Sequence, residues 1–242
     1  MSAPAEPIRD RAPGKQPVDQ EMPRPRPQHI VHEGRWARLE PLDPTAHAAD
    51  LYALGHADEA ARRTWDYLPY GPFPSAEAHA AWLTAQATAD DPLFFAVVDR
   101  ASGQAVGVAS LMSIAPEHGS IEIGHLWFSP RLQRTPVATE ALYLLLTHAL
   151  DDLGYRRMEW KCDAANAASR RAAARLGYRH EGVFFNHRVV KGHNRDTAWF
   201  SILDEEWPRL RAAFAEWLAP ENFNADGTQR ARLSDLTRPS AP

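Results

Sequence analysis

The chain has 242 residues, a formal net charge of −4 at pH 7 and one cysteine, with 44% hydrophobic and 24% charged residues. That composition is ordinary for a globular protein, and it excludes the basic face that nucleic acids need, a disulfide framework and a multi-cysteine metal site. No apolar run approaches the ~18 residues that cross a bilayer, and the first residues lack the apolar core of a signal peptide. We therefore expect a cytoplasmic protein without a membrane or nucleic-acid partner.

The two ends of the sequence differ from its middle. Residues 1–28 hold seven of the 20 prolines and almost no large apolar side chains. Such a segment buries too little surface to offset its ordering entropy, so a disordered arm is predicted there. The polar residues 219–242 are predicted to be a flexible tail. One folded domain is expected between them, over residues 29–218.

Seven strands are predicted in this domain from alternating or continuous apolar runs bounded by turn residues. They cover residues 35–42, 93–99, 105–114, 120–128, 157–163, 179–190 and 195–203. The helices are expected at residues 44–54, 57–65, from an N-cap at 75, at 138–153, 167–177 and 205–218. Strands first form a meander and then alternate with helices. This order predicts an α/β (α+β) sandwich around a mixed sheet.

The stretch SPRLQRTPVATEA, residues 129–141, leads from a predicted strand into a helix. The first turn of a helix carries unpaired amides and a positive dipole end, which together suit a phosphate. Glycine is common in such loops, whereas this chain has Thr135, Pro136 and Val137. Proline is tolerated at the first helical position because its missing N–H has no partner there anyway. From these residues alone, a phosphate cradle and a simple connecting loop both remain open.

The context of this loop resembles the GNAT acyltransferase superfamily, in its RimJ/RimL-like branch. The family's pyrophosphate loop, Gln/Arg-x-x-Gly-x-Gly/Ala, corresponds to residues 133–138, with Pro136 in place of the first glycine. An Asn, a Ser three residues later and a closing Leu-Gly-Tyr correspond to Asn166, Ser169 and residues 176–178. Asp196 in the last hairpin is a looser match. The resemblance covers roughly residues 35–207 and implies a GNAT fold with a V-shaped opening between its fourth and fifth strands.

The resemblance implies acetyl-CoA as co-substrate and no metal. The pantetheine arm is expected on the main chain of the fourth strand, the pyrophosphate on the loop amides, and the thioester oxygen on an amide near Leu126. The cofactor-binding positions that follow from the resemblance are Leu126, Trp127, Phe128, Gln133, Arg134, Thr135, Val137, Ala138, Thr139 and Asn166. Ser169 is expected to protonate the leaving sulfur. By their residue types alone, Asn166 and Ser169 are equally an N-cap and a first-turn helix residue.

Two residues of the fourth strand, Glu122 and His125, are candidates for the base that deprotonates an attacking amine. Each has a structural alternative. Glu122 alternates with Ile121 and Ile123 and then simply faces solvent, and His125 is then a hydrogen-bonded structural histidine. Cys162 is most simply a small buried residue.

The acceptor groove is expected on the loop after the first strand, which carries the aromatic stretch WDYLPYGPF. Its substrate-binding candidates are Trp65, Tyr67 and Tyr70, with Asp196 on the opposite hairpin. The alternative is that these aromatic rings form a hydrophobic plug beneath a long loop.

Together these features predict an acetyl-CoA-dependent N-acetyltransferase, an acyltransferase that moves an acetyl group to a primary amine by direct attack. The acceptor is either a protein N-terminus or a small-molecule amine. The alternative is a GNAT-fold module that binds CoA without turnover and acts as a sensor or interaction protein. The N-terminal arm and the apolar residues of the last helix, Trp207, Phe214 and Trp217, offer surfaces for a homodimer.

Overall fold

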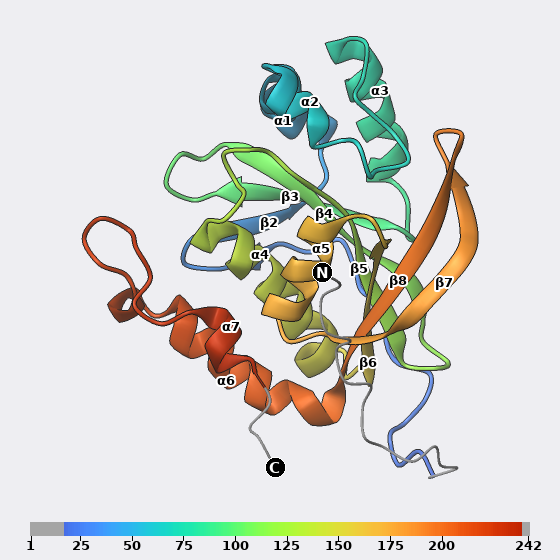
Figure 1. Cartoon of the computed structure of the whole chain (residues 1–242), viewed down its shortest axis with the longest axis vertical. Helices are drawn as coiled ribbons and strands as arrows, with labels where there is room; N and C mark the ends of the chain where they lie inside the picture. Colours follow the sequence, from blue (N-terminus) through green and yellow to red (C-terminus); the bar gives the residue numbers. More distant parts are fainter. Residues whose placement is uncertain (1–16, 239–242) are drawn as a thin grey trace, which may run out of the picture.

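The computed structural model describes residues 17–238, which form one mixed sheet with helices on both faces (Figure 1). The strands are β1 (His32–Glu33), β2 (Ala37–Pro41), β3 (Leu93–Asp99), β4 (Ala105–Ala115), β5 (Ser120–Phe128), β6 (Arg157–Asp163), β7 (Arg179–Val190) and β8 (His193–Leu203). The α-helices are α1 (Pro44–His56), α2 (Glu59–Arg63), α3 (Ala76–Ala87), α4 (Pro136–Thr147), α5 (Ala167–Arg175), α6 (Trp207–Leu218) and α7 (Leu233–Leu236). A π-helical turn, His148–Asp152, extends α4, and 3-10 turns lie at Asp204–Glu206 and Pro220–Asn222.

The sheet has eight strands in the order β1-β2-β3-β4-β5-β6-β8-β7. Strands β1 to β5 form an antiparallel meander, and β6, β8 and β7 form a second antiparallel group. The two groups meet at β5 and β6, which are parallel and pair only from Ser120 to Glu122. Beyond Glu122 the two strands separate. The V-shaped opening predicted between the fourth and fifth strands is therefore present, and it lies between β5 and β6. The numbering differs by one because the structure has an additional first strand, β1, which is too short to show a sequence pattern.

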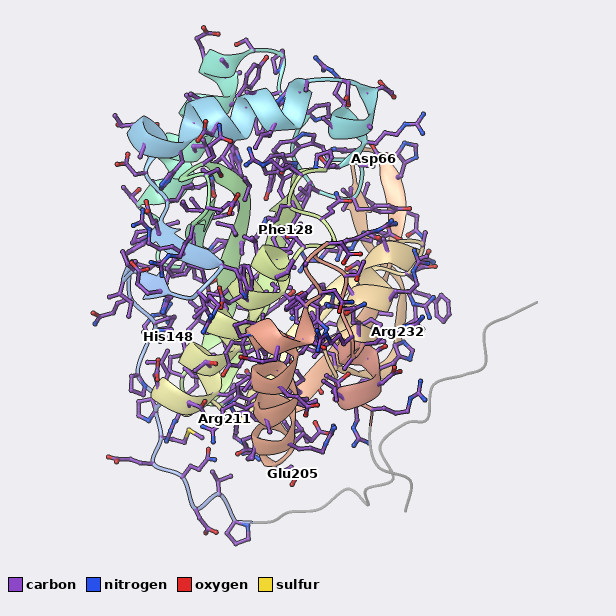
Figure 2. The ribbon with its side chains drawn as sticks, turned by 90° about the vertical axis from the view of Figure 1, so that its left-hand side faces the viewer. Asp66, Phe128, His148, Glu205, Arg211 and Arg232 are labelled. Atoms are coloured by element: carbon purple, nitrogen blue, oxygen red, sulfur yellow. The ribbon has the colours of Figure 1, made fainter. Side chains whose placement is uncertain are left out.

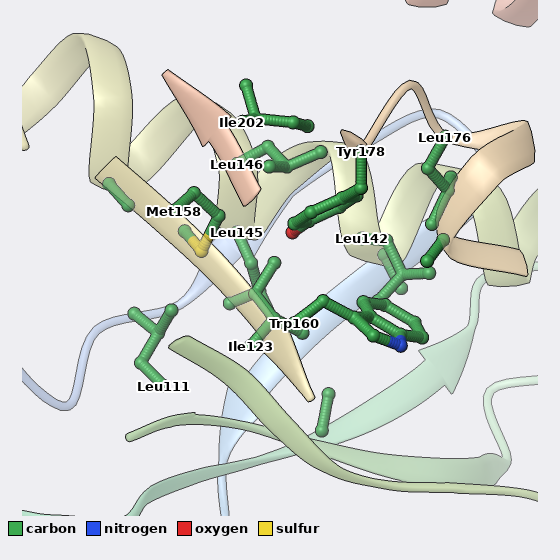
Figure 3. Close-up of a cluster of buried hydrophobic side chains, with 14 of the residues drawn as sticks. Leu111, Ile123, Leu142, Leu145, Leu146, Met158, Trp160, Leu176, Tyr178 and Ile202 are labelled. Carbon is green, nitrogen blue, oxygen red and sulfur yellow. The ribbon is translucent and has the colours of Figure 1, made fainter. Parts of the chain in front are cut away.

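Two apolar layers hold the helices against the sheet. The larger lies between the sheet and α4 and α6, and it includes Leu145, Met158, Trp160 and Phe214 (Figure 3 shows the part around β6 and α4). The smaller lies on the other face, beneath α1, α3 and the loop after α2. Because β5 alternates, Ile121 and Ile123 enter the larger layer while Glu122 points to the opposite face. No helix within residues 17–238 is long and apolar enough to cross a membrane.

A buried carboxylate ties the start of α4 to the first strands. Glu140, with 6% of its surface exposed, accepts hydrogen bonds from the main-chain amides of Arg35 (2.9 Å), Trp36 (2.5 Å) and Ala37 (2.7 Å). Gly34 precedes this turn, and a Cβ there would lie 2.4 Å from the Glu140 carboxylate, so only glycine allows the close approach. The carboxylate thereby satisfies three amides at once and sets the position of the first turn of α4.

Residues near both ends of the described chain contact the domain. Arg24 donates from its amide to the Pro116 carbonyl (3.0 Å) and from Nε to the Leu153 carbonyl (3.1 Å). Near the other end Leu233 is fully buried. Composition does not reveal these contacts because each depends on a few side chains that meet distant carbonyls. Residues 1–16 and 239–242, where the arm and tail are also predicted, lie outside the described residues.

The three apolar residues considered for a homodimer contact are buried within their own chain. Trp207, Phe214 and Trp217 are at most 3% exposed and pack in the larger apolar layer. Helix α6 is amphipathic because it covers the sheet and α4, and it presents none of these three side chains to another molecule.

Replacing Glu140 with alanine is expected to lower the free energy of unfolding by about 2–4 kcal/mol, because three amides lose their common acceptor. Chemical denaturation monitored by tryptophan fluorescence measures this loss. Glu216→Ala, at an exposed position of α6, is the matched control and should change stability by less than about 0.5 kcal/mol. Equal stabilities of the two variants would contradict the role given to Glu140.

Candidate active site

The opening between β5 and β6 leaves one edge of β5 without a strand partner. The amide of Ser129 bonds to the Val106 carbonyl on β4 (3.2 Å), and main-chain groups alternate along a strand. The main-chain groups of Leu126 and Phe128 therefore face the opening, where the Gln133 side chain donates to the Phe128 carbonyl (3.0 Å). Figure 2 shows Phe128 between the α1 layer and the start of α4. A ligand with amide groups can add to this edge like a short strand.

A β-bulge bends β5 at this opening. Ser110 pairs with Gly124 and Val108 with Trp127, so His125 and Leu126 together oppose the single residue Ala109. His125 takes a positive φ of 48°, which is uncommon for a residue with a side chain. The extra residue turns the strand away from β6 and directs the imidazole towards the aromatic loop.

The loop before α4 ends in a capped helix. Thr135 is the N-cap, and its hydroxyl accepts the amide of Ala138 (3.2 Å), while its carbonyl accepts the amide of Thr139 (3.4 Å). Pro136 occupies the first turn. The amides of Arg134, Thr135 and Val137 have no partner among residues 17–238. Three main-chain donors at the positive end of a helix are thus available for an anion.

Glycine is not needed in this loop because another residue makes the turn. Arg134 adopts a left-handed φ of 64°, and Pro136 has the φ that the first helical position requires. Of the predicted phosphate contacts, the amides of Ala138 and Thr139 are occupied within the cap. Gln133 is also occupied, by the Phe128 carbonyl. The amides that remain unpaired in this loop are consequently fewer than the loop sequence predicts.

Helix α5 begins on the other side of the opening. Asn166 is its N-cap and accepts the amide of Ser169 (3.0 Å), so the predicted capping role is confirmed. The Ser169 hydroxyl accepts a hydrogen bond from Nε1 of Trp160 (3.0 Å). A hydroxyl that accepts the indole hydrogen keeps its own hydrogen for donation. Nearby Cys162 is buried, which raises the pKa of its thiol and makes it a poor nucleophile.

Residues 37–179 match the family described as "Acetyltransferase (GNAT) domain". The chain belongs to the GNAT acetyltransferase family. A solved "GCN5-related N-acetyltransferase from Brucella melitensis" is 46% identical, with a TM-score of 0.88, and the alignment covers 91% of this chain and 99% of that one. The family and the fold predicted from the sequence are both confirmed.

More distant relatives have been linked to ribosomal proteins. "Putative ribosomal N-acetyltransferase YdaF" of Bacillus subtilis (strain 168) is 28% identical over 105 residues, which are 43% of this chain and 57% of that protein. A Salmonella typhimurium structure, described as one that "modifies N-terminal serine of 50S ribosomal subunit protein L7/L12", shares the fold. Its TM-score is 0.62 at 20% identity, and the alignment covers 72% of this chain and 99% of that one. The match to YdaF spans less than two thirds of its length.

In this GNAT domain Glu122 lies where β5 and β6 separate. It is 5% exposed, and its Oε2 atom accepts hydrogen bonds from the Ser113 hydroxyl (3.0 Å) and the Lys161 ammonium (2.8 Å). Its Oε1 atom has no hydrogen-bond partner among residues 17–238. The expectation that Glu122 simply faces solvent is wrong, because β6 supplies Lys161 beside it. One feature of the sequence could have indicated this pair: Lys161 lies between two apolar residues, Trp160 and Cys162, of a predicted strand.

The other candidate base, His125, is enclosed by aromatic rings. Nδ1 lies 3.2 Å from the Tyr70 hydroxyl, and the ring lies 5.2 Å from that of Phe94. Burial, with Arg195 nearby, lowers the pKa of His125 to about 4. The imidazole is therefore neutral at pH 7 and a weak base. Burial also raises the pKa of Tyr70 above its usual range, so its phenol stays protonated.

Two aromatic residues predicted to bind ligands instead form part of the core. The rings of Trp65 and Trp127 stack with centroids 4.7 Å apart, and each is 1% exposed. Their indole groups donate to the Gly55 carbonyl (3.0 Å) and the Thr64 hydroxyl (2.8 Å), and the Trp127 main chain pairs with β4. Trp65 is thus not a substrate contact and Trp127 not a cofactor contact. The hydrophobic plug interpretation is correct for Trp65.

The remaining acceptor candidates lie at the mouth of the opening. Tyr67 is 45% exposed, and its hydroxyl donates to the Ala165 carbonyl across the opening (3.4 Å). On the β7–β8 hairpin, Lys191 donates to the Trp65 carbonyl (3.0 Å). Asp196 accepts the Asn186 amide (2.7 Å), which lowers the pKa of its carboxyl. Asp196 therefore holds the bulge of its own hairpin.

No cluster of three or more His, Cys, Asp or Glu side chains that could hold a metal ion occurs in the part of the chain that the structure describes.

Acidification should destabilise the domain through its buried histidines. His79 is 1% exposed, and burial lowers its pKa to about 4, from about 6.5 when unfolded. Above pH 6.5 neither state binds the proton, so stability is complete. As the pH falls from 6.5 to 4, the unfolded state binds it first and the free energy of unfolding decreases. Denaturation at several pH values in this range gives the free energy of unfolding as a function of pH. His79→Gln should reduce the slope of that dependence by on the order of 1 kcal/mol per pH unit.

His118→Gln is the control, since His118 is exposed on the turn before β5. An unchanged slope in the His79 variant would contradict the assignment of this proton to His79.

Proposed function

We propose that this GNAT protein transfers an acetyl group from acetyl-CoA to a primary amine, and that the acceptor is the N-terminal amine of a protein. The observation that carries the proposal is the free edge of β5 beside three unpaired amides at the start of α4. An edge strand suits the amide-bearing pantetheine arm, and the helix start suits the pyrophosphate.

When bound, acetyl-CoA supplies the activated acetyl group. The residues that fit its arm are Leu126 and Phe128, through their main chain, and those that fit its phosphates are Arg134, Thr135 and Val137, through their amides. An amide of the bulged part of β5, near Leu126, is suited to stabilise the oxyanion that develops on the carbonyl. Asn166 keeps a side-chain NH₂ group without a partner among residues 17–238, and this group is suited to an amide carbonyl of the arm.

Glu122 is the better candidate for the base that removes a proton from the acceptor ammonium. One carboxylate oxygen is held by Lys161 and Ser113, while the other is free to accept. A carboxylate held in this way is oriented, whereas the imidazole of His125 is surrounded by rings and has a pKa of about 4. The Ser169 hydroxyl hydrogen, which also interacts with the Cys162 sulfur, is suited to protonate the leaving thiolate.

The acceptor assignment is supported by the name of the YdaF relative and by the mouth of the opening. Only two hydrogen bonds described at the mouth join its sides, one from the exposed Tyr67 and one from Lys191. Breaking the Tyr67 bond, which is exposed, costs little, because water replaces the lost partner. A polypeptide terminus can therefore enter between the aromatic loop and the hairpin.

Glu122→Gln should lower kcat at least about 100-fold while the affinity for CoA stays within about twofold, because the change removes the base and leaves the β5 edge intact. Lys161 keeps Glu159 (2.7 Å) as a partner, so the fold should persist. Glu159→Gln is the matched control from the same ion-pair network and should retain most of the rate. Wild-type kcat in the Glu122 variant would remove Glu122 from the mechanism.

The function itself is tested by calorimetry with acetyl-CoA, followed by an acetyl-transfer assay. Short peptides with different N-terminal residues would be compared with polyamines and aminoglycosides, with mass spectrometry to locate the acetyl group. We expect acetylation at a peptide α-amine. Transfer only to small amines would overturn the acceptor, binding without transfer to any amine would favour a CoA-binding module, and no binding would overturn the proposal as a whole.

A further inference from the structure

Arg175, at the end of α5, is a half-buried arginine without an acidic partner among residues 17–238. Its Nη1 atom donates to the Thr139 hydroxyl (3.2 Å), and its guanidinium lies 4.9 Å from the centre of the Trp217 ring. Burial lowers its pKa, yet an arginine remains charged at any physiological pH. Within residues 17–238 this partly desolvated positive charge therefore has no carboxylate in ion-pair contact.

Two other half-buried arginines of the described chain are paired with carboxylates. Arg157 contacts Glu159 (2.7 Å) and Glu181 (2.6 Å), and Arg179 contacts Glu206 (2.6 Å). Their charges are compensated inside the chain. A methionine could pack against Trp217 equally well, so packing alone does not explain why position 175 carries a guanidinium.

The position of Arg175 relates it to the proposed cofactor site. Thr139 follows the N-cap Thr135 by about one helical turn, so the guanidinium lies beside the start of α4, where the unpaired amides are. The side chain is held by two contacts and the main chain of the same residue by a third. Thr139 belongs to α4 and Trp217 to α6, and the Thr237 hydroxyl donates to the Arg175 carbonyl (2.9 Å) from beyond α7.

We propose that Arg175 binds a phosphate group at the nucleotide end of the cofactor, an inference that rests on the proposed use of acetyl-CoA. A guanidinium presents a planar set of donors that matches phosphate oxygens, and only one atom of this set is used within the described chain. The phosphate supplies the missing negative charge. The two candidate sources are the pyrophosphate and the 3′-phosphate of CoA, which share this chemistry.

The test is calorimetric titration of the full chain with CoA and with 3′-dephospho-CoA. Arg175→Met keeps an unbranched side chain for Trp217, and Arg171→Met is the control, at an exposed position of the same helix. We expect Arg175→Met to raise the Kd for CoA at least tenfold, Arg175→Lys to restore part of the affinity, and Arg171→Met to have no effect. Melting temperatures without ligand, within a few degrees of each other, would show that the variants are folded.

The dephospho-CoA arm identifies the phosphate. If Arg175→Met weakens the binding of CoA but not that of dephospho-CoA, the 3′-phosphate is the partner of Arg175. If it weakens the binding of both ligands, the partner is the pyrophosphate. Either result supports the proposal. A folded Arg175→Met variant that binds CoA like wild type would overturn it while leaving the proposed function intact. If the wild-type protein does not bind CoA, both this proposal and the proposed function are overturned. This outcome is distinguishable because the wild type and every variant then lack binding.

Discussion

The short pairing between β5 and β6 is the constraint on which the rest of the site depends. Parallel hydrogen bonds join the strands only from Ser120 to Glu122, and the bulge at His125 then turns β5 away. A continuous sheet would satisfy the main chain of Leu126 and Phe128 and leave no place for a ligand. The same separation places Glu122 at the closed end of the opening and the starts of α4 and α5 on its sides.

Much of the fold follows from local patterns. Residues 93–99, 120–128, 157–163 and 179–190 are strands with the bounds expected from their apolar runs, because burial selects the same residue types that favour extended chain. The N-caps Ser75 and Asn166 are also found as expected. The loop with Pro136 does precede a capped helix, as the family motif predicts.

Long-range contacts account for what the sequence could not reveal. Trp65 and Tyr67 are two residues apart and both aromatic, yet one is in the core and the other exposed at the mouth. That difference arises from stacking on Trp127, a partner 62 positions away. Likewise, the pairing of Glu122 with Lys161 requires β6 beside β5, and the surroundings of Arg175 depend on Thr139 and Trp217, which are distant in the sequence.

Pro136 has a consequence for how firmly the start of α4 is set before any ligand arrives. A glycine loop is conformationally mobile, and ordering it on binding removes entropy from the complex. Here the proline ring, the Thr135 cap and the carboxylate of Glu140 restrict the same backbone during folding. The amides of Arg134, Thr135 and Val137 are therefore preorganised, and the rigidity of this helix start is a property of the unliganded chain.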